Sequence, residues 1–485
     1  MNRALAPDRL AVLVGAFDRA PAYRGLRLAL QELIGDGRIA IGTRLPSERA
    51  VTAALGVSRN TVTRAYADLV AAGFAVARQG AGTYAAAPID LRRAHDHALH
   101  SFAATQSAEG AIDLNCAAGA ATPGVAAAYQ RALDALPSYL ASDGYLPSGL
   151  PGLQAIIAES YVRRGLPTAA AQIVITSGAL SGIAIAARAL SRPGDRIMIE
   201  SPVYSNAIEA LRLGGGRLIS APLSDPLGDE GWDMHGIEAT LRQTSPHLAY
   251  LIPDFQNPTG FLMGDAARAR YAAALRRART IAIVDETLQP TSLSDEPMPA
   301  PFARHAADAI TIGSASKMFW GGLRVGWIRA PRELVSRIVA ARVQIDLGSS
   351  LFDQLVVAEL FGAADIRAAR REQLRQRRDA LAQALAERLP GWRFRLPGGG
   401  LTLWVQMPHG SATRLAADAE RAGVHLAPGP VFSVEGGADH WLRLPYAKPE
   451  EALRLAVARI AGLWSAHPHE SKPKQRREPA RRLIA

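Results

Sequence analysis

The chain has 485 residues, 48% hydrophobic and 20% charged, with a formal net charge of +11, which suits a soluble globular protein of two to four domains. No run of about 18 apolar residues occurs, so we expect no membrane span. A single cysteine excludes an internal disulfide and suits a reducing, cytoplasmic compartment. The net positive charge favours an acidic partner, most simply a nucleic acid, although part of the excess charge lies near the end of the chain.

The first two predicted elements are helices. Residues 10–17 are apolar and bracketed by charges, so we expect a short amphipathic helix within residues 1–20 rather than a signal peptide. Residues 23–34 place their apolar side chains at helical spacing on one face. This second helix begins a compact unit that we assign to residues 21–85.

Two further helices joined by a tight turn follow. Ser47 is a suitable N-cap for a helix that ends at Leu55, and Ser58 caps the next helix after a turn at Gly56. That next helix has apolar residues at i, i+3, i+4, i+7 and i+8, which should face a core: Val62, Ala65, Tyr66, Leu69 and Val70. Its other face carries polar types that bind phosphates and base edges. The alternative is a helical bundle with a merely solvated polar face.

Two short strands, 74–77 and 83–86, complete this unit as a glycine-rich hairpin, and the order of elements predicts a winged helix-turn-helix. The stretch 45–84, LPSERAVTAALGVSRNTVTRAYADLVAAGFAVARQGAGTY, resembles the winged-helix domain of GntR-type bacterial regulators. The resemblance implies binding of double-stranded DNA by Arg49, Ser58, Arg59, Asn60, Thr61, Thr63, Gln79 and Gly80. We add Arg44 and Arg64 as phosphate partners.

The remaining chain divides into a linker, a large domain and a tail. Residues 86–111 show no sustained period and predict a linker, and the basic, proline-containing residues 466–485 predict a disordered tail. In residues 112–465, short apolar runs alternate with helical patterns, which predicts a mostly parallel α/β sheet. The expected strands are 173–176, 196–200, 248–252, 280–285 and 309–312, with helices at 179–190 and 265–279. A smaller α+β lobe is expected from about 394 onward.

The most informative stretch, 309–329, ends a buried strand with S-x-S-K and continues into G-x-R-x-G. The chain has 55 Lys plus Arg, but only four are Lys, so Lys317 at the end of a buried strand invites a chemical explanation. A Schiff base needs a lysine, because arginine stays protonated. A solvated lysine at a strand end is the simple alternative.

Other expected strand ends carry groups suited to a phosphorylated pyridine. The backbone N–H groups of Gly178 and Ala179, at a helix N-terminus, are typical of phosphate binding. Asn257, in a rigid Q-N-P-T-G turn, can donate to a phenolate oxygen, and Asp285 at a buried strand end needs a cationic partner. Taken singly, the first two fit ordinary turns equally well.

Together these residues resemble fold-type I pyridoxal-phosphate enzymes of the aminotransferase class I/II group. The resemblance implies a Schiff base at Lys317, with Asp285 at the pyridinium nitrogen and Asn257 at the ring hydroxyl. It further implies phosphate contacts from Gly178, Ala179, Ser314, Ser316 and Arg324, ring stacking by Tyr204, a reach of Tyr145 to the neighbouring subunit's phosphate, a carboxylate clamp at Arg443, and Gly119 near the substrate loop. Thr287 stands where most relatives carry a ring-hydroxyl tyrosine, which implies weak turnover.

A GntR-type winged helix ahead of an aminotransferase-like domain resembles the MocR group of bacterial regulators. This implies a cytoplasmic, nucleoid-associated, head-to-tail homodimer that senses an amino compound, or pyridoxal phosphate itself, through Lys317. No metal is expected. Two alternatives stay open: a working aminotransferase tethered by its DNA-binding domain, and a constitutive DNA-binding protein whose large domain serves only dimerisation.

Overall fold

The computed structural model describes residues 4–35, 39, 42–78, 80–86, 111–362 and 364–466. Gln79, nearly all of the predicted linker and all but the first residue of the predicted tail lie outside these residues.

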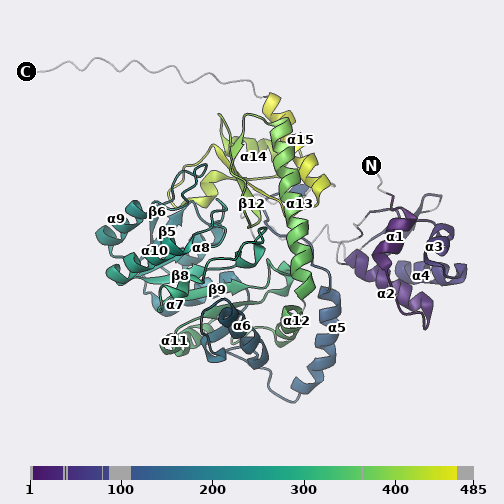
Figure 1. Ribbon diagram of the computed structural model, residues 1–485, viewed down its shortest axis with the longest axis horizontal. Helices are drawn as coiled ribbons and strands as arrows, with labels where there is room; N and C mark the ends of the chain where they lie inside the picture. Colours follow the sequence, from purple (N-terminus) through teal and green to yellow (C-terminus); the bar gives the residue numbers. More distant parts are fainter. Residues whose placement is uncertain are drawn as a thin grey trace, which may run out of the picture.

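The N-terminal unit consists of helices followed by an antiparallel hairpin, as the sequence predicts (Figure 1). Ser47 Oγ accepts the N–H of Ala50 at 3.3 Å, and Ser58 Oγ accepts the N–H of Thr61 at 3.2 Å, so both predicted caps form. The elements are α1 Pro7–Val14, α2 Ala22–Gly35, α3 Glu48–Leu55, α4 Arg59–Ala71, β1 Ala75–Arg78 and β2 Gly82–Ala85.

The predicted buried face of α4 is correct except at its last position. Val62, Ala65, Tyr66 and Leu69 are buried in the core of the unit, whereas Val70 is 38% exposed. At about 100° per residue, Val70 lies farthest from the centre of the apolar stripe, so it turns away from the core. The expectation that Val70 faces this core was wrong.

The large domain is built on a mostly parallel sheet, as expected. Only β10, among the strands described in this sheet, runs antiparallel to its neighbours β9 and β4. In the described residues the strand order is β4-β10-β9-β8-β7-β5-β6, with β4 Ile173–Thr176, β10 Gly326–Arg329, β9 Ile310–Ser314, β8 Ile281–Asp285, β7 Leu248–Leu251, β5 Arg196–Ser201 and β6 Arg217–Pro222.

Helices cover both faces of this sheet, which gives three layers (Figure 1). One face packs against α6 Pro151–Arg163, α9 Met234–Thr244, α10 Asp265–Ala278 and α12 Leu351–Phe361, with α5 Val125–Ala135 outside α12. The other face packs against α7 Ala179–Leu190, α8 Ser205–Leu213 and α11 Arg332–Val343. Short 3-10 helices lie between elements of this domain: η2 Leu136–Tyr139, η3 Ala170–Gln172, η4 Gln289–Thr291, η5 Phe302–Arg304 and η6 Gly321–Leu323. A further one, η7 Gly429–Phe432, belongs to the smaller lobe.

A smaller α+β lobe follows the large sheet, and its long helix α13 runs beside α15 (Figure 1). The described strands of its sheet have the order β11-β12-β15-β14. Its elements are α13 Ala364–Arg388, β11 Arg393–Phe394, β12 Thr402–Gln406, α14 Ala412–Arg421, β13 Val424–His425, β14 Ala427–Pro428, β15 Trp441–Pro445 and α15 Glu450–Ala466. The first strand of the large domain, β3 Ile112–Asp113, pairs in parallel with β13.

A buried ion pair fixes the loop after β7. Arg268 on α10 and Asp254 in the loop approach to 2.7 Å, with 0% and 1% of their side chains exposed. Arg268 also donates to the carbonyl groups of Met263 and Ala300 at 2.7 and 2.9 Å. These contacts hold the backbone that leads to Asn257.

Replacing Arg268 by Met leaves the Asp254 carboxylate buried without this cation, so the large domain should lose about 3–5 kcal/mol of unfolding free energy. Denaturant titration followed by tryptophan fluorescence measures the loss. Arg131→Met, which removes an ion pair to Glu359 with 50% and 41% exposed side chains, is the control and should leave the midpoint near wild type. Equal midpoints for the two variants would contradict the prediction.

Candidate cofactor site and DNA-binding surface

Most of the predicted cofactor residues gather at one edge of the large sheet. Asn257 follows β7, Asp285 is the last residue of β8, and Lys317 follows β9. Parallel strands place their carboxyl ends along a common edge, which is where open α/β sheets bind ligands. We call this the carboxyl edge.

Lys317 lies half-buried at the carboxyl edge, and its Nζ donates to the carbonyl of Ala117 at 3.0 Å. Burial lowers the pKa of the Lys317 amine below that of a free lysine. The cations Arg443 and Arg324 lower this pKa further, while Cys116 and Asp285 act in the opposite direction. The neutral amine is the nucleophilic form. Lys317 is therefore activated by its surroundings.

Asp285 is 5% exposed and accepts two hydrogen bonds. Tyr250 Oη donates to Oδ2 at 2.7 Å, and the N–H of Thr287 donates to Oδ1 at 2.8 Å. Burial raises the pKa of Asp285, and these donors oppose the rise because they favour the carboxylate. Tyr250 was not among the predicted site residues; the available signal was a tyrosine inside a buried strand, whose hydroxyl needs a partner.

The predicted phosphate residues converge beside the N-terminus of α7. Arg324 takes a left-handed backbone conformation with φ of 50° and donates to the carbonyl of Ser177 at 3.3 Å. Gly178 has φ of 95°, a conformation that strains any other residue, and a Cβ there would lie 2.7 Å from Arg324 Nη2. Ser314 Oγ accepts the N–H of Ser316 at 3.1 Å. The buried Ser316 Oγ has no hydrogen-bond partner among the described residues.

A buried network that the sequence patterns did not reveal supports this end of the site. Arg342 is fully buried and donates to the carbonyl groups of Pro147 and Ile175, to Asp346 and to Ser349. Ser177 Oγ in turn lies 3.2 Å from both Asp346 Oδ2 and Ser349 Oγ. The network therefore ties two loops to the turn that precedes α7.

Arg443, in β15, lies at the other end of the site and is 3% exposed. Its Nη1 donates to Asn257 Oδ1 at 3.4 Å, its Nη2 donates to the carbonyl of Asn115, and its guanidinium lies 4.7 Å from the Phe432 ring centre. Because Asn257 accepts with Oδ1, its Nδ2 is left as the donating side of the amide. Burial lowers the pKa of Arg443 to about 10, and Arg443 Nε has no partner in the described part of the chain.

The remaining predicted residues differ in their placement. Tyr204 is half-buried, its hydroxyl accepts from Asn206 at 3.1 Å, and burial raises its pKa. A Cβ at Gly119 would lie 2.9 Å from the carbonyl oxygen of Ala447, so Gly119 is sterically required. Tyr145 is 63% exposed and is not brought into the site of its own chain.

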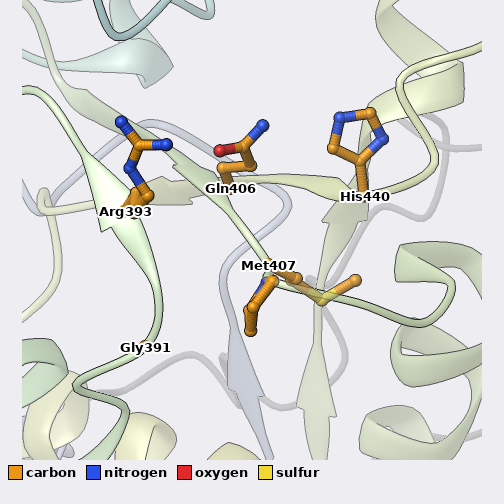
Figure 2. Close-up of a pocket in the computed structure, with 6 residues that line it drawn as sticks. Gly391, Arg393, Gln406, Met407 and His440 are labelled. Carbon is orange, nitrogen blue, oxygen red and sulfur yellow. The ribbon is translucent and has the colours of Figure 1, made fainter. Parts of the chain in front are cut away.

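A cavity of about 460 Å³ lies elsewhere, in the smaller lobe (Figure 2). The side chains of Arg393, Gln406 and His440 border it, and none of the predicted site residues does. Gln406 pairs with the first residue of β15, whereas Arg443 lies further along that strand. We therefore separate this cavity from the cofactor site.

The predicted DNA contacts lie mainly on the exposed part of α4. Arg59, Asn60, Thr63 and Arg64 are exposed, and Thr61 is half-buried. Several of their groups are already engaged: Arg64 stacks 3.7 Å from the Tyr23 ring centre, Thr63 donates to Glu48 at 2.6 Å, and Thr61 bonds to Ser58 at 2.9 Å.

Arg49 and Arg44 extend this surface toward the hairpin. Both are exposed, and a Cβ at Gly82 of β2 would meet Arg44 Nε at 3.0 Å. Gly80 occupies the hairpin turn with φ of 72°. Basic side chains therefore lie on the helix-turn-helix and also beside the hairpin that forms its wing.

Comparison with known families decides the identity of both units. The family of bacterial regulatory proteins, gntR family, matches residues 22–85, and aminotransferase class I and II matches residues 127–460. The chain belongs to the aminotransferase class I and II family, with a GntR domain ahead of it. It is a pyridoxal-phosphate-dependent transcription regulator of the MocR type. No described helix of this regulator is long and apolar enough to cross a membrane.

Individual relatives include both regulators and enzymes. The HTH-type transcriptional regulator TauR of Rhodobacter capsulatus is 28% identical over 492 residues, which is 93% of this chain and 99% of the relative. The 2-aminoadipate transaminase of Thermus thermophilus is 30% identical over 331 residues, covering 66% of this chain and 80% of the relative. The structure of LysN, an α-aminoadipate aminotransferase from Thermus thermophilus complexed with N-(5'-phosphopyridoxyl)-L-leucine, superposes with a TM-score of 0.66 at 28% identity, covering 74% of this chain and 94% of that one.

The carboxyl edge of this regulator fits pyridoxal phosphate. The donors for a phosphate monoester are the Ser316 hydroxyl, which has no partner among the described residues, the Arg324 guanidinium, and the N–H groups at the start of α7, which helix geometry leaves without intrahelical acceptors. The buried Asp285 carboxylate has no cation in hydrogen-bond contact among the described residues, which suits a protonated pyridine nitrogen.

The lowered pKa of Lys317 generates a prediction for cofactor attachment. The neutral fraction of the amine rises with pH, so the rate at which the cofactor-free protein gains a borohydride-reducible bond to added pyridoxal phosphate should reach half its plateau below the pKa of free lysine. Arg443→Gln removes a nearby cation and should move this midpoint upward. Absorbance after rapid mixing measures the rate, and Lys317→Ala should give no covalent attachment. A midpoint at or above that of free lysine would disprove activation by burial.

Proposed function

We propose that this regulator senses a small amino compound, or pyridoxal phosphate itself, through a Schiff base at Lys317. Binding of that compound would change the affinity of the protein for its DNA operator. The observation that carries the proposal is the pairing of two groups in one site. Lys317 is an activated amine, and Arg443 is a buried guanidinium whose Nε lacks a partner among the described residues. Together they suit an α-amino acid, whose carboxylate takes a guanidinium bidentately.

Different residues of the carboxyl edge would bind different parts of the cofactor. Pyridoxal phosphate supplies an aldehyde that takes up primary amines and a ring that accepts electrons. Asp285 would hold the ring nitrogen, Asn257 Nδ2 the ring hydroxyl, and Tyr204 the ring face. Phosphate contacts would come from Gly178, Ala179, Ser314, Ser316 and Arg324. Arg443 would hold the carboxylate of an effector amine, and the Lys317 side chain would be free to move once its amine is not bonded to the cofactor.

A head-to-tail homodimer completes the proposal. Tyr145 is 63% exposed, and nearby in sequence Leu140 is 70% exposed. Ile345 and Leu347 are 49% and 47% exposed; they lie in the loop that Arg342 ties to the Pro147 backbone. Such apolar exposure on connected loops suits burial against a second copy, in which Tyr145 would reach the neighbouring phosphate.

Aminotransferase activity is the second candidate, because the 2-aminoadipate transaminase is 30% identical over the matched region. Lys317, Asp285 and Arg443 would supply the lysine, aspartate and arginine that such an enzyme needs. Thr287 favours sensing over turnover, since it replaces a group that would bond to the ring hydroxyl. Proton transfer and hydrolysis need groups placed for transition states and not only for binding.

DNA binding should depend on the tip of α4. Arg59→Ala should cost about 1–3 kcal/mol of operator binding if Arg59 makes a bidentate base contact, and Arg64→Ala should weaken binding through a lost phosphate contact. Fluorescence anisotropy on operator DNA measures both, and affinity should fall steeply with salt. Arg131→Ala, exposed on α5 of the large domain, is the control. Unchanged affinity in the Arg59 and Arg64 double variant would refute this placement.

Two measurements on one preparation test sensing against catalysis. Candidate amines are screened for a shift in the visible absorbance of the bound cofactor, and each hit is assayed for keto-acid release and for a change in operator affinity. We expect a spectral shift and altered DNA affinity with turnover below about 1 per second, and Lys317→Ala should abolish the DNA response. Faster turnover with unchanged DNA affinity would make this chain an enzyme. A purified protein without cofactor absorbance would instead favour constitutive DNA binding.

A further inference from the structure

Two arginines on α13 lie beside the backbone that lines the site. Arg377 Nη1 donates to the carbonyl of Ala447 at 2.8 Å. A Cβ at Gly119 would meet that same carbonyl oxygen at 2.9 Å and Arg370 Nη2 at 3.0 Å. Arg370 and Arg377 are seven residues apart, so they share one face of the helix. Both guanidinium groups therefore face the meeting point of Gly119 and Ala447.

This arginine pair lacks a counter-ion among the described residues. The other arginines along this part of α13 have carboxylates: Arg371 and Arg375 contact Asp295, and Arg378 contacts Asp379. Arg370 contacts only the neutral Gln373 through its side chain, and its Nε is buried without a partner in the described part of the chain. Burial lowers the pKa of Arg370, and burial with the charge of Arg370 lowers the pKa of Arg377 to about 10. Both side chains are half-buried, and two neighbouring guanidinium groups that are partly removed from water are stabilised by an anion between them.

The pair is continuous with the cofactor site through a single backbone segment. The carbonyl of Asn115 accepts a hydrogen bond from Arg443, and the carbonyl of Ala117 accepts one from Lys317. Gly119, in the same segment, packs against Arg370. Gly119 is two residues beyond Ala117, which is at most about 7 Å of extended chain. Ala447 is four residues beyond Arg443, or at most about 14 Å. The pair therefore lies at the rim of the site, several bonds away from the reacting amine.

We propose that Arg370 and Arg377 form a second anion-binding subsite, which takes the distal anionic group of an amino-acid effector whose α-carboxylate lies on Arg443. The inference rests on the proposed sensing function and specifies its ligand class: α-amino acids with a second carboxylate, or a comparable oxyanion, at the end of a carbon chain. Guanidinium groups suit such oxyanions because each donates two parallel hydrogen bonds. Gly119 lets the backbone come this close to the pair, since a Cβ there would lie 3.0 Å from Arg370 Nη2.

The test compares two probes that differ only at the distal end, namely 2-aminoadipate and norleucine. Cofactor absorbance of the holoprotein is titrated with each. Wild type should prefer 2-aminoadipate by about tenfold or more, the worth of a charge-assisted contact. Arg370→Gln should remove the preference and leave the response to norleucine unchanged, and Arg377→Gln should reduce it. Arg371→Gln, the same charge loss on the same helix, should keep it.

A second measurement needs no response to an amine. Inorganic sulfate should raise the melting temperature of the wild-type and Arg371→Gln holoproteins more than that of Arg370→Gln, because a ligand that binds the folded state stabilises it. In wild type, sulfate should also compete with 2-aminoadipate but not with norleucine.

The outcomes separate this inference from the proposed function. Equal wild-type responses to both probes, or an Arg370→Gln variant that loses both equally, would overturn the subsite while leaving amine sensing intact. If neither probe shifts the spectrum, amine sensing by this class fails, and the sulfate comparison alone decides the subsite: equal stabilisation of all three proteins would reject it. If Arg370→Gln does not fold, selective competition by sulfate in wild type supports the subsite, and competition against both probes or neither rejects it.

Discussion

Burial of charge at the carboxyl edge is the constraint on which the rest of this structure depends. The sheet, its helices and the smaller lobe bury Asp285 and Arg443 and leave Lys317 half-buried. Burial raises the pKa of Asp285 and lowers the pKa of Lys317 and of Arg443, which favours the neutral form of each. Such groups are tolerated only where neighbours stabilise them. Tyr250 and the backbone N–H of Thr287 do so for Asp285, and backbone carbonyls do so for the two cations. The burial of these charged groups lowers the stability of the fold, and it also favours binding of a ligand with complementary charges.

The backbone that caps these cations is the part of the large domain nearest to the DNA-binding unit along the chain. Asn115 and Ala117 follow β3, and β3 follows the predicted linker. A ligand that binds Lys317 and Arg443 would replace the hydrogen bonds that these two side chains donate to the carbonyls of Ala117 and Asn115. If the proposed sensing function holds, this segment would join the effector's site to the linker that leads to the winged helix, and the anisotropy measurements test that connection.

The winged helix itself depends on a separate core. Its buried residues pack among themselves, and the N-caps at Ser47 and Ser58 set where α3 and α4 begin. Side chains that the sequence assigned to DNA also support the unit, since Arg64 packs on Tyr23 and Thr63 bonds to Glu48. A loss of DNA affinity on substitution of Arg64 or Thr63 would therefore combine a lost DNA contact with a weakened winged helix. Substitution of Arg59 tests the DNA contact more directly.

The sequence by itself determined the fold class, both family resemblances, the caps and most strands, because these follow from local periodicity and short motifs. It also led to Lys317, Asp285, Asn257 and Arg443, which stand in specific patterns at strand ends. It could not reveal Tyr250 at Asp285, the Arg342 network or the Arg370 and Arg377 pair. Those depend on which side chains meet across the fold, between segments far apart in the chain, and on which charges are left buried without a partner. Only tertiary structure decides that, because burial is a property of the packed molecule.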